Sequence, residues 1–441
     1  MPKSRPGPII AALTSPMIPP RRRLSPISGR EGCAGFDLTG NARRSPVADG
    51  STFRAHSVVD DFSLMWITSD PQHPSGARDL RLQGHYSGKN ADSDRIGLVH
   101  PNEMESRRRP LAEREVKIFD PRDASTGSGG AELLDASVTQ RQEQWCLYLA
   151  GQVDRYGATD IYAAYLPSGA PLSATGWQLQ RGTGGQPTPI AGRSQSRAWD
   201  GNGGRHCPSY IKGWDTRKRE WVERIYYAGA AEHLWGPYAI GFLEWDGDRW
   251  ADQSEPVFSA NDDWEHGSVY EPNLIYHEGK WRMWYVAGSN HEDYLVQGYA
   301  ESEDGRTGWS KHIVFAPPEM RLFDFCVRAR EGTFCAIFAR VWVGGGASPP
   351  QTGLWWCEAA APSSRLSEWS EPVQIMTAED RGWHSGPWKP SFDFPEDTGE
   401  RAVVFFDGCY RTDEPGPFPF AFTLGCADIH LPGESEGHSD V

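Results

Sequence analysis

Two β-strands joined by a tight turn are predicted by the stretch EPNLIYHEGKWRMWYVAGS, which runs from Glu271 to Ser289. Its aromatic and β-branched residues favour strands on both sides of the dipeptide Glu278-Gly279, which favours a turn. A third strand is predicted in LVQGYAESEDG and a fourth in WSKHIVF. About 50 residues therefore give four antiparallel strands in sequence, which is the pattern of one β-propeller blade.

The same order of strands recurs on both sides of this stretch. The other copies begin in DASVTQRQEQWCLYLAG, CPSYIKGWDTRKREWVERIYYAG, FDFCVRAREGTFCAIFAR and WKPSFDFPEDTGERAVVFFDG. The repeat predicts an all-β protein, a five-bladed β-propeller in which each blade is a four-stranded antiparallel sheet. A pair of β-sandwiches is the alternative, but it would not explain why the endings LAG, YAG and VAG return at the same place in three successive units.

Aligning the copies shows which residues open the first strand of each blade. These residues are Asp135, Cys207, Glu271, Phe325 and Lys389. The last copy runs out near Ile429 with three strands, so we expect the ring to close with a strand from before the first blade. The segment EVKIF, Glu115 to Phe119, is the candidate.

Four segments are expected along the chain. Residues 1–50 are rich in Pro, Arg, Ser and Gly, which predicts a disordered leader. Residues 51–110 are expected to form an N-terminal extension that packs on the propeller. The propeller itself is expected to span residues 111–430, and residues 431–441 to form a disordered tail.

Charge and composition restrict the partners of the chain. A formal net charge of -15 disfavours binding to nucleic acid or to an anionic membrane surface. No apolar stretch reaches the roughly 18 residues that span a bilayer, and no export signal is recognised. The 8 cysteines form neither a dense disulfide framework nor a C-x-x-C pair. We expect a cytoplasmic protein with a small-molecule or oligosaccharide substrate and no cofactor; the oligomeric state stays open.

Acidic residues at the starts of the first strands are the candidate catalytic groups. The innermost strand of every propeller blade runs along the central axis, so these starts converge on one funnel. Asp135, Glu271 and Asp324 are predicted to lie there. Cleavage of a glycosidic bond needs one protonated and one ionised carboxyl group. Burial and mutual repulsion can push the pKa values of two such groups apart.

First strands that open with Asp or Glu, followed by a G-K-W-x-M-W-Y second strand, resemble the five-bladed propellers of glycoside hydrolase families 32, 43 and 68. The resemblance covers roughly residues 111–430. It implies that Asp135 in LLDASV is the nucleophile or general base, and that Glu271 in YEPNLIY is the general acid. In the arabinanase and xylosidase branch the blade-three acid instead tunes a neighbouring pKa, and a blade-four acid, near Asp324 here, donates the proton.

Two motifs of these families are incomplete in this chain. The Arg-Asp-Pro motif of blade two is replaced by Arg-His-Cys-Pro at 205–208, and the Glu-Cys-Pro motif of blade three lacks its Cys. These departures favour two alternatives to a glycosidase. One is a cyclase, isomerase or lyase that uses the same pocket acids, and the other is a non-catalytic carbohydrate-binding propeller.

Loops that lead into the first strands supply the predicted substrate-binding residues. His and Trp side chains there suit hydroxyl binding and stacking on a sugar ring, whereas no tight ligand spacing predicts a metal site. Arg and Lys could neutralise an acidic group of the ligand, or pair with Asp135 and Glu271. The predicted residues are Arg205, His206, Trp264, His266, Trp383, His384, Trp388 and Lys389. Structural roles stay open as well: a turn for Asp135, a solvated strand edge for Glu271, and a salt bridge from Asp324 to Arg328.

Overall fold

The computed structural model describes residues 111–431, without 153–157, 194–197, 231–235, 290–293, 316–321, 331, 342–350, 380, 396–400 and 412–419. The expectations for residues 1–50 and 51–110 lie outside the described residues, as do residues 432–441 of the expected tail. No helix in the described part of the chain is long and apolar enough to cross a membrane.

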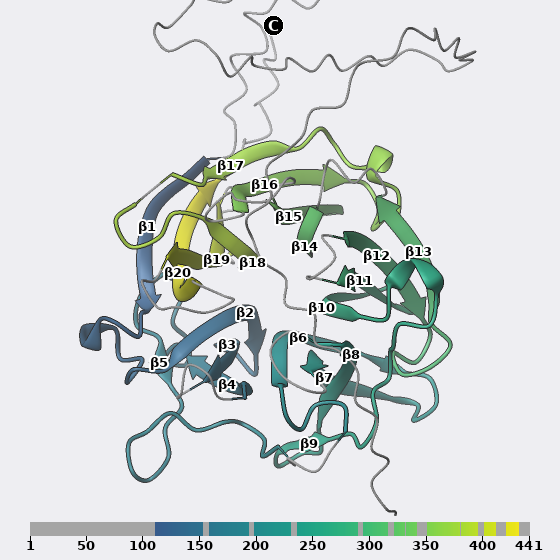
Figure 1. Ribbon diagram of the computed structural model, residues 1–441, viewed down its shortest axis with the longest axis horizontal. Helices are drawn as coiled ribbons and strands as arrows, with labels where there is room; N and C mark the ends of the chain where they lie inside the picture. Colours follow the sequence, from purple (N-terminus) through teal and green to yellow (C-terminus); the bar gives the residue numbers. More distant parts are fainter. Residues whose placement is uncertain are drawn as a thin grey trace, which may run out of the picture. The chain divides into compact units, whose positions relative to one another are not determined.

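Five four-stranded antiparallel sheets surround a central axis (Figure 1). This arrangement confirms the five-bladed propeller and excludes the pair of sandwiches. Blade one contains β2 (Glu132–Arg141), β3 (Gln144–Gln152), β4 (Asp160–Tyr165) and β5 (Gln178–Leu179). Blade two contains β6 (Gly204–Asp215), β7 (Glu220–Ala230), β8 (Tyr238–Trp245) and β9 (Trp250–Asp252). Blade three contains β10 (Val269–His277), β11 (Lys280–Ser289), β12 (Tyr294–Ser302) and β13 (Ser310–Phe315).

The last two blades differ in how they are completed. Blade four contains β14 (Leu322–Arg330), β15 (Thr333–Val341), β16 (Gln351–Ala359) and β17 (Val373–Thr377). Blade five contains β18 (Pro387–Asp393), β19 (Arg401–Arg411), β20 (Phe420–His430) and, as its outermost strand, β1 (Leu111–Phe119). The predicted closing segment therefore lies within β1, and the prediction is confirmed. Short 3-10 helices lie between strands: η1 (Ala124–Thr126), η2 (Asp263–Glu265) and η4 (Leu366–Glu368).

The apolar core lies between neighbouring sheets, and the KWRMWY motif of β11 shows why. Trp281 and Trp284 are fully buried. They are three positions apart on a strand, so their side chains point to opposite faces of the sheet. Trp281 packs against Tyr226 of blade two, and Trp284 packs against Phe325 of blade four. One strand thus fills two interfaces. The described cysteines are likewise buried, and all seven are unpaired.

Each innermost strand is bulged at the same place. The pairing register of β2, β6, β10, β14 and β18 is interrupted near the start of the strand. The residue at each interruption has a positive φ of 49–58°, uncommon for a residue with a side chain. These residues are Asp135, Cys207, Glu271, Asp324 and Lys389. The alignment with Phe325 in blade four was therefore wrong by one position, because Phe325 is stacked on Phe338 in the core.

Hydrogen bonds join the bulged strands of neighbouring blades. In four of the blades, the side chain two positions after the bulge residue accepts a hydrogen bond from a backbone N–H of the next blade. Ser137, Ser209, Asn273 and Ser391 do so at 2.9–3.1 Å. In blade four the residue at this position is Cys326, whose Sγ accepts a hydrogen bond from Asn273 Nδ2 at 3.3 Å. These bonds link all five strands and hold the bulges at one level along the axis.

Candidate active site

The five bulge residues meet at the axis in a pocket of about 40 Å³. Each comes from a different blade, and each side chain is directed inward by the same local backbone conformation. The starts of the first strands were predicted to converge, and this prediction is confirmed. The repeat brings together residues that are up to about 250 positions apart in the sequence. Three of the five are acidic: Asp135, Glu271 and Asp324.

Lys389 connects the carboxyl groups of this pocket. Its Nζ lies 2.8 Å from Asp135 Oδ1, forms a second salt bridge with Glu271 Oε1, and donates a hydrogen bond to Cys207 Sγ at 3.1 Å. Burial alone would lower the pKa of Lys389, but the surrounding acids, Asp135 foremost, raise it well above its usual value. The lysine therefore remains charged. Arg205, the other predicted cation, instead pairs with Asp200 and Asp252.

Asp135 is held in its ionised form. Its Oδ2 accepts a hydrogen bond from Cys207 N at 2.9 Å, in addition to the contact of Oδ1 with Lys389. Burial would raise the pKa of Asp135, but the charge and hydrogen bond of Lys389 outweigh burial and lower the pKa below its usual value. A buried, ionised carboxylate directed into a pocket can act as a nucleophile or a base.

The pKa values of Glu271 and Asp324 are shifted in the opposite direction, upward. Burial, together with the negative charge of Asp135, raises the pKa of Glu271 despite the attraction of Lys389. Burial and the neighbouring Glu271 raise the pKa of Asp324 well above its usual value. The predicted alternative, a salt bridge from Asp324 to Arg328, is not observed. The Arg328 guanidinium instead donates hydrogen bonds to the carbonyl oxygens of Val327 and Val138. The pocket thus combines one ionised carboxylate with two groups that retain protons to higher pH.

Asp407 of β19 is a site residue that the sequence analysis missed. Its Oδ1 and Oδ2 accept hydrogen bonds from Asp135 N at 3.1 and 3.0 Å, and the side chain is buried. Burial and the nearby Asp135 charge raise the pKa of Asp407 well above its usual value. A signal was present in the sequence. The second strand of blade five ends in FFDG, where LAG, YAG and VAG place alanine in other blades.

Two predicted residues lie close to the pocket without lining it. The buried His206 ring contacts Thr159 Oγ1 through Nε2 at 2.9 Å and packs edge-on against Tyr238. Burial lowers the pKa of His206 to about 4. The centre of the Trp388 ring lies 5.7 Å from Lys389 Nζ.

The remaining predicted binding residues do not line the pocket: Arg205, Trp264, His266, Trp383 and His384. Trp264 lies in η2 and packs against Tyr285, and His266 follows η2 with an exposed side chain. His384 is buried with its Nε2 2.9 Å from Glu115 Oε2, and Trp383 packs edge-on against His384. Among the described residues, no group of three His, Cys, Asp or Glu side chains is arranged to hold a metal ion.

The fold and the pocket together define a five-bladed β-propeller with an acidic, lysine-bridged axial site. No family model matches the sequence, and no curated protein matches it. Among solved structures, a glycoside hydrolase overlaps with a TM-score of 0.50 at 13% identity, over 75% of this chain and 95% of that one. A structure described as an RGII complex overlaps with a TM-score of 0.51 at 14% identity, over 78% of this chain and 98% of that one. At these identities the likeness shows a shared fold.

Proposed function

We propose that this chain is a glycoside hydrolase-like enzyme that cleaves a small glycoside or oligosaccharide in the axial pocket. The observation that supports this proposal best is the pair of carboxyl groups with opposite pKa shifts, lowered at Asp135 and raised at Glu271. A glycosidase needs one ionised and one protonated carboxyl group on either side of the scissile bond. The shared fold of solved glycoside hydrolases adds a precedent for the scaffold.

In this proposal Asp135 is the nucleophile and Glu271 the proton donor, with Asp324 as the alternative donor. Asp135 and Glu271 both contact the same Lys389 ammonium. Their nearest oxygens are therefore at most about 6 Å apart, two hydrogen-bond lengths. That limit lies below the roughly 6.5–9.5 Å of inverting enzymes and admits the roughly 5–5.5 Å of retaining ones. We therefore propose retention of configuration.

The salt bridges of Lys389 with Asp135 and Glu271 favour a second candidate function, because they occupy the pocket. The pocket of about 40 Å³ is much smaller than the roughly 300–1,000 Å³ of typical ligand sites. A sugar ring would enter only after the Lys389 side chain moved away from one carboxylate. A protein in which the bridge persists would not hydrolyse glycosides. It would instead be a cyclase, isomerase or lyase with a smaller reacting group, or a carbohydrate-binding propeller.

A release assay separates these candidates. The intact protein would be incubated with a panel of aryl furanosides and pyranosides, beside Asp135→Asn and Glu271→Gln variants and a Glu220→Gln control at an exposed position. We expect release from at least one glycoside, a loss of about 100-fold or more in both pocket variants, and no change in the control. Proton NMR of the first product would show the retained anomer. Binding without release would favour the second candidate.

The cytoplasmic location is part of the same proposal. All seven cysteines in the described part of the chain are buried and unpaired, which suits a reducing compartment. The substrate would then be a glycoside small enough to be imported. The proposed reaction uses the carboxyl groups alone for proton transfer, so it needs no cofactor.

A further inference from the structure

A larger cleft lies at the outer edge of the propeller, between blades two and three. Its volume is about 560 Å³, and its walls come from residues 253–261, which follow β9, and from residues 306–311, which form the β12–β13 turn and the start of β13. We call it the side cleft. Its volume falls within the roughly 300–1,000 Å³ of ligand-binding pockets and is sufficient for one or two sugar rings. It shares no residue with the axial pocket.

Lys311 contributes no open positive charge to the side cleft. Its Nζ donates to Glu265 Oε2 at 2.7 Å, to Asn261 Oδ1 at 2.6 Å and to the Ser259 carbonyl at 2.8 Å. It also lies 4.3 Å from the centre of the Phe258 ring. Because Glu265 is fully buried, the lysine is the counter-ion of that carboxylate. An anionic ligand would have to compete with Glu265 for Lys311.

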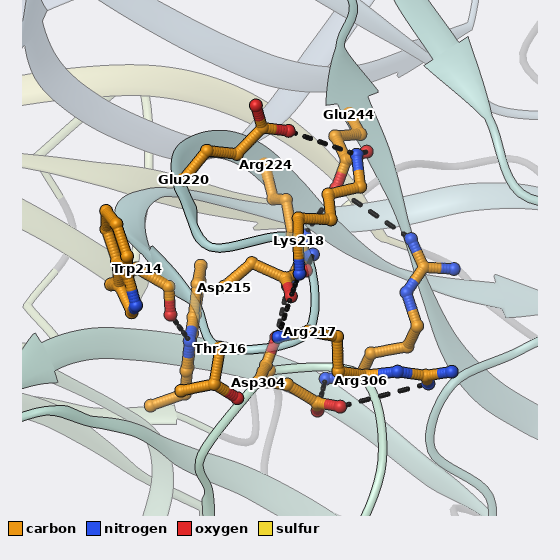
Figure 2. A network of polar contacts seen from close by, with 12 residues as sticks. Trp214, Asp215, Thr216, Arg217, Lys218, Glu220, Arg224, Glu244, Asp304 and Arg306 are labelled. Carbon is orange, nitrogen blue, oxygen red and sulfur yellow. Dashed lines mark hydrogen bonds and ion pairs between the residues drawn. The ribbon is translucent and has the colours of Figure 1, made fainter.

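Arg306 is engaged in the same way. Its Nη1 donates to Gln253 Oε1 at 2.9 Å, and its Nη2 lies 3.8 Å from Glu244 Oε2. Figure 2 shows Arg306 at the edge of a network of alternating charges around the buried Arg224. Both cations of the side cleft face carboxylates, and Glu255 adds an exposed carboxylate to its lining, so the charge balance favours a neutral ligand over an anionic one.

The network in Figure 2 also fixes one wall of the side cleft. Arg224 donates to Glu244 Oε2 at 2.8 Å and to the Asp304 carbonyl at 2.7 Å. The Asp304 carboxylate accepts hydrogen bonds from the backbone of Arg306 and Thr307 at 2.7 Å, and from Thr307 Oγ1 at 2.8 Å. The turn that carries the wall is therefore held in place before any ligand arrives. Such preorganisation reduces the entropic cost of binding.

The lining combines ring surfaces with hydrogen-bonding groups. Phe258 and Trp309 form an edge-to-face pair with centroids 5.7 Å apart, and Gln253, Ser254 and Thr307 add amide and hydroxyl groups. Apolar faces beside polar edges suit a molecule that has both, as a sugar ring does. We propose that the side cleft is a second, non-catalytic binding site for a neutral saccharide of one or two rings. The proposal does not depend on hydrolysis at the axial pocket.

Binding would be measured by saturation-transfer NMR and calorimetry with maltose, lactose and xylobiose, and with inorganic phosphate as the anionic probe. The Asp135→Asn protein serves as background, so that turnover does not consume the probe. Ser254→Trp fills the side cleft from an exposed position, and Ser168→Trp places the same ring on an exposed loop of blade one. We expect at least one disaccharide to bind, and its affinity to fall tenfold or more with Ser254→Trp but less than twofold with Ser168→Trp.

Three results would overturn this proposal: no disaccharide binds, binding is insensitive to Ser254→Trp, or phosphate binds in preference to the disaccharides. Circular dichroism melting curves of both tryptophan variants would show that each remains folded. The outcome is separate from that of the release assay. A protein that releases no aryl glycoside could still bind a disaccharide in the side cleft, and an active one could lack this site.

Discussion

Replacing Lys389 with methionine would keep most of the side-chain volume and remove the ammonium that contacts both Asp135 and Glu271. The lysine side chain is only 13% exposed, so water would not replace it freely. Removing one partner of a buried ion pair costs about 3–5 kcal/mol, because the other charge is left without compensation. We expect Lys389→Met to lower the free energy of unfolding by about that amount at pH 7.5.

The loss in the free energy of unfolding caused by Lys389→Met should depend on pH. In the native protein the lowered pKa of Asp135 means that the pair stabilises the fold above the unfolded pKa of about 3.9, and that this contribution is lost as pH falls through the folded value. Without Lys389, burial is opposed only by weaker effects such as the hydrogen bond from Cys207 N, and it raises the folded pKa of Asp135. The variant is then most stable at low pH and loses stability as pH rises. We therefore expect a cost of about 1–2 kcal/mol at pH 4.5.

Urea denaturation followed by tryptophan fluorescence at pH 4.5 and 7.5 would measure both values. Lys212→Met is the control, because Lys212 is exposed on β6 and its replacement should change stability by no more than about 0.5 kcal/mol. An equal loss at both pH values would refute the reasoning, since the variant would then fail for packing and not for charge. A loss at pH 7.5 no larger than that of the control would refute it as well.

Three further predictions concern groups around the pocket. Because burial lowers the pKa of His206 to about 4, the native protein should lose about 3 kcal/mol as pH falls from the unfolded value of about 6.5 to 4. His206→Gln should flatten that slope in urea titrations between pH 4 and 7. Asp407→Leu leaves Asp135 N without its acceptor and should cost about 1–3 kcal/mol in thermal denaturation, and more than Asp407→Asn. Ser209→Ala removes the acceptor of Leu274 N and should cost a similar amount, whereas Ser168→Ala at an exposed position should change little.

The repeat predicted the fold because its pattern follows from the packing of the blades. Each second strand must fill the space between two neighbouring sheets, so large side chains recur at fixed positions, as Trp281 and Trp284 do in β11. The small residues at the strand ends recur for a similar reason. At Gly229 an added Cβ would lie 2.4 Å from the Trp199 ring. Both signals are local in sequence and could be predicted without knowing any contact.

The site was harder to predict because it depends on the bulges. In the segment FDFCV either Phe325 or Asp324 could face the axis, and the positive φ of Asp324 decides between them. A bulge leaves no clear sequence signature when a residue other than glycine occupies it. Side-chain partners are a second limit. Pairing of Lys389 with Asp135 and Glu271 was one of two roles that the sequence left open, and only the structure decides for it. Nothing local shows that His266 is exposed after η2.

The fifth blade has a consequence for the order in which the chain is made. Its outermost strand, β1, is the first part of the propeller to be synthesised, yet it pairs with β20, the last. Leu111 and His430 are partners in this antiparallel ladder, so a short turn could join them directly. A circular permutant that links position 430 to position 111 and opens the chain after β1 would make all four strands of blade five consecutive. Such a protein should assemble the same ring without waiting for its earliest strand to find its latest.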